Sequence, residues 1–576
     1  MAGAISIFLS FNDVQTSLLH LSPDLPTSPK REVPMDLIVF LSVISLSPAG
    51  LLLTTLSSPA ILYLCGSIMV RRRVRFIVAF VIIAALILLG SRFHISNHPH
   101  LTHLGPSNPK SPGCIQHLGW LEPYQFSSPI EYVSRDIIVR PREGTQRLPL
   151  TVVDEPLFES STWFNLAESP TLHIEHCLPP LQLEVSHGSM VRVDASNMIF
   201  GLQTTIERLR DTVKYLARWL PYTGARLYAI VIDTHDDKEI PADNNEMQAL
   251  EEQMRDLGMD VHVIHPSNPT DSFAQRYFSI VNVLYNSRDN NSQWMICIDD
   301  DTFFPSMNDL QNMLREHDWR KPQYIGSLSE DWWAVDNYGL MGFGGAGVML
   351  SRPMAKIMYD HYDECKRRPR TTAGDVTVMD CIYHFSSTKL TPIPGLHQVD
   401  MHGDVSGFYE SGREMLSLHH WKGGKLKMEK MHMIADICDN CFLQRWQFQQ
   451  GLILSNGFSI ASYPQQRLTL GGLSSIADSV NFSLMEQTWS DDIKVLHSLA
   501  PLRPKLDENQ KVGYKLLDSM IVDGEEIDAP GEKVVRQVYF KEGGQSEGRD
   551  KVMVLNWRSS PEIDHNGDGV QVHPLI

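Results

Sequence analysis

The sequence predicts an α/β fold with a mostly parallel sheet, and three observations lead to this prediction. Apolar runs of strand length alternate with amphipathic runs of helical length between residues 198 and 298, which is typical of a parallel sheet with covering helices. Two of the apolar runs end in acidic side chains, at Asp233 and at Asp299. The 576 residues are 43% hydrophobic and 20% charged, with no long low-complexity tract, so we expect a folded chain with a buried core.

The alternating segment contains the expected elements in a regular order. Strands are expected at residues 198–202, 226–233, 261–265 and 294–298, and helices at residues 205–220, 246–257 and 272–285. In such sheets ligands bind beyond the carboxyl ends of the strands. Asp233 and the three aspartates that follow residue 298 occupy that edge, so they are candidate binding residues.

The N-terminal part of the chain predicts a membrane anchor. Residues 76–89 are apolar and uncharged, and four arginines stand directly before them at residues 71–75. A basic cluster followed by an apolar run is typical of a signal-anchor, which we place at residues 69–92, with the C-terminal bulk opposite the arginines. A buried core helix is the alternative, and the arginines disfavour it. Residues 1–68 are expected to be a leader or a gene-model extension, and residues 93–125 a stem rich in Pro, Ser, His and Asn.

The strand–helix alternation predicts a domain boundary near residue 445. Residues 126–444 are expected to form the α/β domain, with its core at 195–440. Beyond residue 445 the alternation stops, so residues 445–576 are expected to form a partly β C-terminal appendage. The net charge of −18 argues against nucleic acid as a partner, because phosphate contacts need clustered Lys and Arg.

Seven of the eight cysteines follow the expected anchor, so a lumenal chain could form disulfides. Seven is an odd number, and Cys297 is the candidate free thiol because it lies in an apolar strand pattern. Cys365 and Cys381 are a plausible pair. Cys438 and Cys441 could form a tight disulfide, with a zinc site as the weaker alternative.

The strongest local motif is the run of three carboxylates at Asp299, Asp300 and Asp301, directly after an apolar strand. Adjacent carboxylates repel one another, and a bound divalent cation would relieve that repulsion. Oxygen ligands suit Mg²⁺ or Mn²⁺. A solvated acidic loop is the alternative, but the position after a buried strand favours a metal site.

Three further motifs follow. Gly344 and Gly345 would allow a ligand to approach the backbone closely, although neither the dinucleotide-binding nor the phosphate-loop pattern is present. Trp332 and Trp333 could form a platform for stacking a sugar, although core packing is the commoner role of tryptophan. Asp375, before an amphipathic helix, could be a functional acid or only a helix cap.

The order of these motifs carries more information than any one of them. The aspartates at 299–301, the GGAG run at 344–347, the GDVT run at 374–377 and the SLHHW run at 417–421 occur in one segment. This order resembles the Fringe-like glycosyltransferases of glycosyltransferase family 31, in a branch that looks like its fungal and plant DUF604-type members. The resemblance covers roughly residues 195–440.

The resemblance implies a fold, an activity and a compartment. It implies a GT-A fold, which is Rossmann-like, and an inverting, metal-dependent transfer of a sugar from a UDP-sugar to a hydroxyl of a glycan or glycoprotein. It also implies a single-pass type II protein of the Golgi membrane, with the catalytic domain in the lumen. The resemblance leaves the sugar and the acceptor open.

The resemblance further implies roles for the acidic and imidazole side chains. It places Mn²⁺ or Mg²⁺ on Asp301, with Asp299 and Asp300 holding the metal or the ribose of the donor. His419 matches the histidine that completes the metal shell, and His420 is its neighbouring rival.

Asp375 matches the general base of the family. The family often has two adjacent acids there, whereas this chain has Gly374 before Asp375, so a possible helper is missing. The expected donor-binding residues are Thr204, Thr205, Arg208, Asp233, Asp300, Gly344 and Gly345. The expected acceptor-binding residues are Trp332 and Trp333. Two alternatives remain open, namely a non-catalytic carbohydrate-binding or scaffold protein on the same fold and a metal-dependent hydrolase.

Overall fold

The computed structural model describes residues 114–559 with gaps at 143–146, 159, 175–176, 187–192, 237, 368, 401–405, 414, 421–427, 439–440, 464–466, 471–472, 477–505, 508, 525–530 and 544–548. The chain divides into two compact units, residues 1–105 and 106–576, and every described residue belongs to the second. The predicted leader, the predicted anchor and residues 93–113 of the predicted stem lie outside the described residues. Within the described part, each helix is too short or too polar to cross a bilayer.

An eight-stranded sheet forms the α/β part, with strand order β10-β8-β7-β11-β13-β12-β14 and β9 paired to β8. Its strands are β7 (Met198–Thr205), β8 (Arg226–His235), β9 (Lys238–Ile240), β10 (Asp260–Ile264), β11 (Trp294–Cys297), β12 (Tyr324–Gly326), β13 (Val348–Ser351) and β14 (Leu390–Pro392). The β10, β8, β7 and β11 strands run parallel, which confirms the predicted strands, whereas β13 runs antiparallel to β11 and β12. The sheet is therefore mixed.

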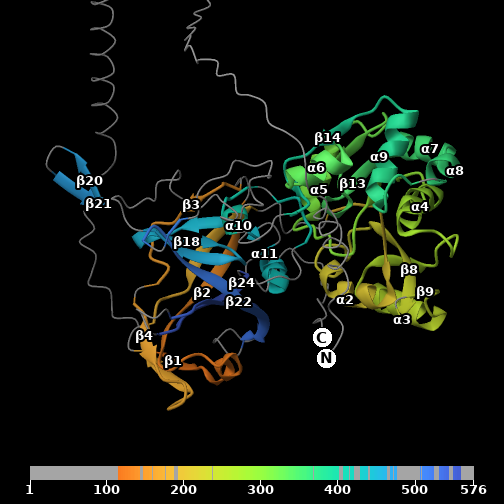
Figure 1. The fold of residues 1–576 in the computed structure, drawn as a ribbon. Coiled ribbons are helices and arrows are strands. Elements are labelled where there is room, and N and C mark those ends of the chain that lie inside the picture. The colour runs from red at the N-terminus through yellow and green to blue at the C-terminus, as the bar shows by residue number, and fades with distance from the viewer. Residues whose placement is uncertain are drawn as a thin grey trace, which may run out of the picture. The chain divides into compact units, whose positions relative to one another are not determined.

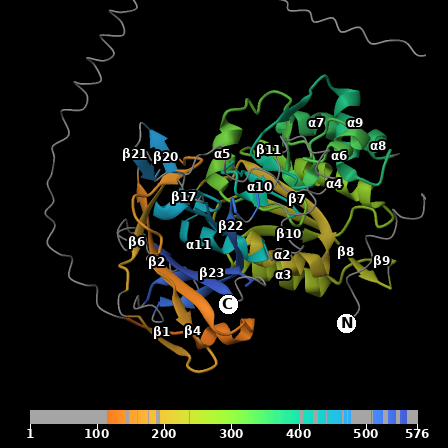
Figure 2. The same cartoon turned by 60° about the vertical axis from the view of Figure 1, so that its left-hand side comes forward.

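Helices cover both faces of this sheet, as Figures 1 and 2 show. They are α2 (Ile206–Leu216), α3 (Asn244–Asp256), α4 (Phe273–Asn286), α5 (Met307–Arg315), α6 (Trp332–Tyr338), α7 (Arg352–Asp360), α8 (Tyr362–Lys366) and α9 (Gly374–Phe385), with the 3₁₀ turn η3 at Gly344–Ala346. Successive side chains of a strand point to opposite faces. Accordingly Ile199 packs with α4, α7 and α9, whereas its neighbour Phe200 packs with α2 and α3.

The second sheet has ten strands, in the order β3-β17-β18-β19-β22-β23-β24-β2-β4, with β6 paired to β2. Its strands are β2 (Ile130–Arg142), β3 (Thr151–Val152), β4 (Thr162–Phe164), β6 (Leu181–Ser186), β17 (Arg445–Gln447), β18 (Leu452–Ser455), β19 (Ser459–Ser462), β22 (Val512–Asp523), β23 (Lys533–Lys541) and β24 (Lys551–Ser559). The pairing of β2 with β24 is parallel and aligns Glu131 with Lys551.

This sheet corrects the predicted division at residue 445. Strands from residues 130–186, which we expected in the α/β domain, lie in the same sheet as strands from residues 445–559. The C-terminal strands are therefore not an appendage on their own. The physical reason is that β2 pairs with β24, about 420 positions further along the chain. A pairing between segments so far apart produces no local sequence pattern from which it could be predicted.

Shorter elements complete the described chain. They are β1 (Cys114–His117), η1 (Gly119–Tyr124), β5 (Thr171–Ile174), β15 (Leu396–His397), α10 (Ser406–Tyr409), β16 (Ser417–Leu418), η4 (Met428–Ile434), α11 (Ala435–Cys438), η6 (Gln449–Gly451), β20 (Arg467–Leu470) and β21 (Leu473–Ile476). One core cluster contains side chains of both sheets, including Phe200 and Ile296 from the first and Trp446 and Trp557 from the second.

The disulfides confirm most of the cysteine predictions. Cys365 pairs with Cys381 and Cys438 pairs with Cys441, as expected. Cys297 is buried and free, also as expected. The third bridge, Cys114–Cys177, was not anticipated, and it ties β1 to the segment after β5.

Candidate active site

A cavity of about 480 Å³ opens at the carboxyl ends of β7, β8 and β11. It is lined by Gln203, Thr204, Thr205, Arg208, Ile232, Thr234, Glu239, Phe273, Arg276, Asp299, Asp300, Asp301, His419 and His420. The position is the one expected for ligands in an α/β sheet. The lining includes all three consecutive aspartates and both histidines of the 417–421 motif.

Asp300 is the structural member of the three aspartates. It is 5% exposed, and its carboxylate accepts two hydrogen bonds from Arg208, one of them 2.5 Å long, and one from Thr204. The bond to Asp300 raises the pKa of Arg208 further above its usual value, although burial opposes the shift. A bidentate guanidinium pair offsets the repulsion that three adjacent carboxylates would otherwise produce. Asp300 thus fixes Arg208 and Thr204 in the wall of the cavity.

Asp301 and Asp299 instead face an imidazole. The Nε2 atom of His419 lies 2.9 Å from Oδ1 of Asp301 and 3.3 Å from Oδ2 of Asp299. Burial by itself lowers the pKa of His419, but its hydrogen bonds with the two carboxylates raise it well above the usual value. The ring is buried, so its position is fixed by the surrounding chain.

A backbone bridge brings this histidine to the aspartates. Phe303, two positions after Asp301, exchanges backbone hydrogen bonds of 2.8 and 2.9 Å with Leu418, one position before His419. The Nδ1 atom of His419 faces the carbonyl oxygen of Gln398 at 3.2 Å. When Nδ1–H donates to that carbonyl, loss of the Nε2 proton on metal binding would leave a lone pair facing the carboxylate side, which is the arrangement of a metal-ligating histidine.

His420 completes a compact set. Within the described residues, one ligand atom each from Asp301, His419 and His420 lie within 4.8 Å of one another. The Nδ1 atom of His420 lies 3.0 Å from a carboxylate oxygen of Asp400, which leaves its Nε2 atom for a ligand. The set includes the predicted ligands Asp301 and His419 and adds the rival His420. Asp299 is outside it, although it lies beside His419.

Asp375 stands at the start of α9, half-buried. Its two oxygens accept hydrogen bonds from the backbone N–H groups of Gly344, at 3.1 Å, and Val376, at 3.0 Å. Burial and the neighbouring charge of Asp299 raise the pKa of Asp375 to about 6, against the lowering effect of these two bonds. A carboxylate with a pKa near 6 is a stronger base than an ordinary aspartate.

The glycines of the GGAG run act through the space that they leave. A Cβ atom on Gly345 would lie 2.2 Å from the ring of His419, and one on Gly344 would lie 2.1 Å from the hydroxyl of Tyr277. Only residues without a side chain allow the histidine and the tyrosine to approach so closely. Tyr277 is 3% exposed, and its hydroxyl has no hydrogen-bond partner within the described structure.

Some predicted residues lie elsewhere. Asp233 does not line the cavity, whereas its neighbours Ile232 and Thr234 do, because alternate residues of β8 face opposite sides. Trp332 and Trp333 begin α6 and are each 45% exposed, but they are not in the cavity lining either. Helix α6 packs through Ala334 against residues of α9.

Sequence reasoning missed several side chains of the site. Phe273, at the start of α4, is 56% exposed and lines the cavity. Arg276 is buried and makes a bidentate ion pair with Glu239, with distances of 2.6 and 2.7 Å. The sequence did offer one indication. Arg276 lies on the apolar face of a predicted helix, and a buried arginine needs an acidic partner beside it.

The fold and the site together define an α/β protein with a carboxylate and imidazole cluster at the ligand-binding edge of its sheet. Residues 335–435 match the family model described as "Protein of unknown function, DUF604". The matched segment contains the GGAG run, Asp375 and both histidines, but not the three aspartates.

The chain is also similar to two curated proteins. These are chondroitin sulfate synthase 3 of Homo sapiens and of Mus musculus, each 26% identical over 123 residues. The similarity covers 20% of this chain and 14% of each relative, so the chain spans about one seventh of the length of the relatives that it matches.

Among solved structures, three glycosyltransferases are similar over 34% of this chain, each with a TM-score of 0.23. They are a Pyrobaculum calidifontis mannosyltransferase in complex with GDP-Man and Mn²⁺ (10% identity, 55% of that chain), the galactosyltransferase LgtC with donor and acceptor sugar analogs (11%, 73%) and mouse xyloside xylosyltransferase 1 in its apo form (9%, 84%). A TM-score of 0.23 is too low to place two folds in one class.

Proposed function

We propose that this chain is a Fringe-like, family 31 glycosyltransferase that moves a sugar from a UDP-sugar to a hydroxyl of a glycan or glycoprotein, with inversion. The observation that carries the proposal is one ligand-edge cavity holding the Asp301, His419 and His420 cluster, with a raised-pKa carboxylate, Asp375, coupled to it through Asp299. A transferase needs both groups. A bound cation stabilises the negative charge of the leaving diphosphate, and a basic carboxylate removes the proton of the attacking hydroxyl.

The ligand set fits a divalent cation, and Mn²⁺ better than Mg²⁺. One carboxylate and two imidazoles lie within reach of one ion. Mg²⁺ demands near-ideal octahedral geometry and keeps much of its water, so two imidazoles in the set disfavour it, whereas the carboxylate is the ligand type that suits Mn²⁺. When bound, the cation supplies positive charge for the leaving diphosphate. Asp299 stays a predicted ligand.

The remaining wall suits a nucleotide. Thr204 and Thr205 offer hydroxyl groups, and the exposed ring of Phe273 offers a flat surface against which a uracil base can stack. Arg208 lies beside the cluster; its guanidinium is paired with Asp300, but its side chain is 58% exposed, so it can also donate a hydrogen bond to a diphosphate.

Asp375 performs the proton transfer in the proposed reaction. Its carboxylate takes the proton from the acceptor hydroxyl while that oxygen forms a bond to the anomeric carbon. The bond from the anomeric carbon to the diphosphate oxygen breaks, and UDP leaves with the electron pair. Attack from the face opposite the leaving group inverts the configuration. Trp332 and Trp333 remain proposed acceptor contacts because both side chains are exposed on α6, which packs against α9, the helix that carries Asp375 in its first turn.

The comparisons support the same class. Chondroitin sulfate synthase 3 is by name a glycan-synthesising enzyme, and the DUF604 match covers the segment that holds Asp375 and His419. We further propose a Golgi membrane location with the catalytic part in the lumen, anchored by residues 69–92. Three disulfides in the described chain support an oxidising compartment.

A nucleotide-sugar panel tests the proposal. The full chain is heated with UDP-galactose, UDP-N-acetylglucosamine or UDP-N-acetylgalactosamine, in Mn²⁺ or in EDTA. A ligand that binds the folded state raises the melting temperature. We expect at least one UDP-sugar to stabilise the chain in Mn²⁺ and not in EDTA. Glycan binding without stabilisation by any nucleotide would favour the non-catalytic alternative, and sugar release independent of acceptor would favour the hydrolase.

A further inference from the structure

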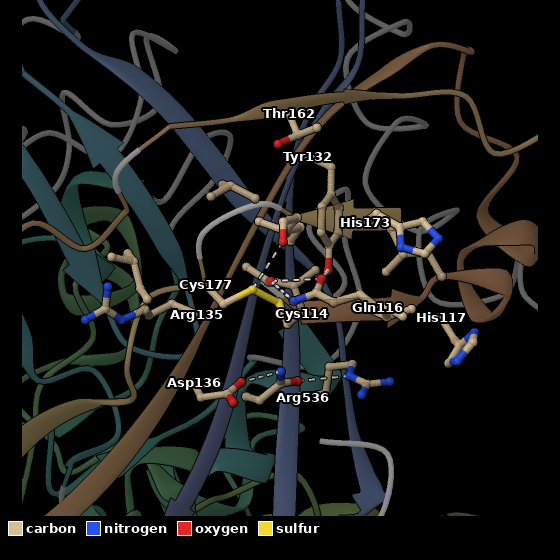
Figure 3. A pocket seen from close by; sticks show the side chains of 18 of the residues that line it. Cys114, Gln116, His117, Tyr132, Arg135, Asp136, Thr162, His173, Cys177 and Arg536 are labelled. Atoms are coloured by element: carbon tan, nitrogen blue, oxygen red, sulfur yellow. Dashed lines mark hydrogen bonds between the residues drawn. A yellow bond between two sulfur atoms is a disulfide. The ribbon is translucent and has the colours of Figure 1, made fainter. Parts of the chain in front are cut away.

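A second cavity, of about 560 Å³, lies on the outer face of the ten-stranded sheet and shares no residue with the cavity of the proposed active site. Figure 3 shows its side chains around the Cys114–Cys177 disulfide, with Tyr132 and Thr162 on one side and Asp136 and Arg536 on the other. Its volume is within the range of about 300–1,000 Å³ that is usual for small-molecule sites.

The floor of this cavity is a polar row across three strands. The strand register aligns Asp136 of β2 with Asn556 of β24, and Asn556 with Arg536 of β23. The side chains are linked, since Arg536 Nε donates to Asn556 Oδ1 at 3.0 Å and Asn556 Nδ2 donates to Asp136 Oδ1 at 2.8 Å. Asn556 and Arg536 are 6% and 4% exposed, so these links fix their orientation.

This row departs from the rest of the same face. One and two rows further along, Val554 and Val552 are covered by Leu118 and Leu121 in an apolar cluster. The covering segment therefore buries most of the apolar rows, while Leu118 and Val554 reach the lining of the cavity beside the polar row. The groups of this row are hydrogen-bonded to one another, and under an open cavity they form a fixed polar surface against which the polar groups of a ligand can bind.

The upper wall adds hydroxyl and amide groups. Gln116 of β1 accepts a hydrogen bond from the Tyr132 hydroxyl at 3.0 Å and donates one to Ser134 at 2.7 Å. Trp120 lies at the edge, with the guanidinium of Arg536 4.6 Å from its ring centre. The disulfide from Cys114 holds β1 against the segment after β5, so the wall is tied in place.

We propose that this cavity is a saccharide-binding site, which holds a sugar unit of a glycan independently of metal and nucleotide. Amide, carboxylate and guanidinium groups fixed by one another match the many donors and acceptors of a polyhydroxyl ring. The aromatic ring at the edge matches the apolar C–H face of a sugar. The floor holds one carboxylate and one guanidinium, and the other guanidinium of the lining, Arg135, lies 4.0 Å from the carboxylate of Glu155, so the cavity lacks the strong single-sign charge that a phosphate site needs.

Saccharide binding to the full chain in EDTA, without nucleotide, tests the proposal. The probes are galactose, glucose, mannose, N-acetylglucosamine, N-acetylgalactosamine and glucuronic acid, measured by saturation-transfer NMR and titration. We expect at least one probe to bind the unaltered chain. Its affinity for Asp136→Asn should be at least 10-fold weaker. Its affinity for Asp299→Asn should be unchanged, because that substitution alters only the proposed active site. If no probe binds, or if Asp299→Asn weakens binding and Asp136→Asn does not, the proposal is overturned.

Hydrogen exchange on the unaltered chain gives a second readout that needs no variant. The bound saccharide should slow exchange in residues 114–120 and 130–136, and protection found only in residues 203–208 would overturn the second site. Failure of the proposed transferase would be seen separately, as absence of Mn²⁺-dependent stabilisation by UDP-sugars.

Discussion

The Gly345→Ala substitution tests the geometry of the proposed metal site. The added methyl would lie 2.2 Å from both Cγ and Nδ1 of His419, whereas ordinary contact begins at 3.4 Å. The ring must therefore retreat by about 3.4 − 2.2 = 1.2 Å. That shift exceeds the tolerance of roughly 0.5 Å for a preorganised site. It would move Nε2 out of its place beside Asp301, now 2.9 Å away.

We expect the displaced ring to weaken Mn²⁺ binding by at least 10–100-fold, the loss usual when the support of a ligand is removed. The assay is a titration of the full chain with Mn²⁺ by calorimetry, beside thermal unfolding without metal. Overpacking should cost about 1–3 kcal/mol of stability, so the variant should still fold.

Gly513→Ala is the matched control, because its new Cβ would meet nothing closer than 3.8 Å, at Lys511. It should bind Mn²⁺ as the unaltered chain does. If Gly345→Ala folds and binds Mn²⁺ with unchanged affinity, the assignment of His419 as a ligand is refuted.

Three further predictions follow from single features. Asp375→Asn should keep donor binding but lower transfer by about 10²–10⁴-fold. In the unaltered chain kcat/KM should fall as the pH drops through about 6, because the protonated carboxyl of Asp375 cannot accept a proton. A rate that is constant across pH 6 would contradict this role. Tyr277→Phe removes a buried hydroxyl that has no hydrogen-bond partner in the described structure. Because an unsatisfied buried hydroxyl costs free energy, urea unfolding should show stability raised by up to about 1–3 kcal/mol. Lower stability of the variant would mean that the hydroxyl is hydrogen-bonded. Replacing Cys365 and Cys381 together by serine opens a loop of 16 residues and should lower the free energy of unfolding by about 3 kcal/mol under non-reducing conditions. Cys297→Ser, at the free thiol, should leave the Cys365–Cys381 bridge in place. Equal melting temperatures for the double variant and the unaltered chain would contradict the bridge.

The sequence was informative where the relevant periodicity is local. The strands and helices between residues 198 and 298 follow from apolar spacing, and the structure confirms them. The antiparallel β13 was not distinguishable, because direction depends on the partner rather than on the strand itself. The ten-stranded sheet was not predictable, since β2 finds its partner β24 at the far end of the chain.

The site was predictable in part for a similar reason. The aspartates at 299–301 and His419 were placed together by motif order, and the structure brings Asp299 and Asp301 within hydrogen-bond distance of His419. Asp233 was misplaced because the end of a strand predicts an edge of the sheet but not the face on which a side chain emerges. Phe273 and Tyr277 of α4 resemble ordinary helix residues, and only tertiary packing brings them to the site.

The most direct test of the account is transfer by the full chain with Asp301→Asn beside the unaltered protein. UDP release from a UDP-sugar that stabilises the chain is measured with a glycan acceptor, in Mn²⁺ and in EDTA. The account predicts acceptor-dependent release in Mn²⁺ that is lost in EDTA and in Asp301→Asn, while the variant keeps its melting temperature without metal. Release by folded Asp301→Asn at the rate of the unaltered chain would contradict the account.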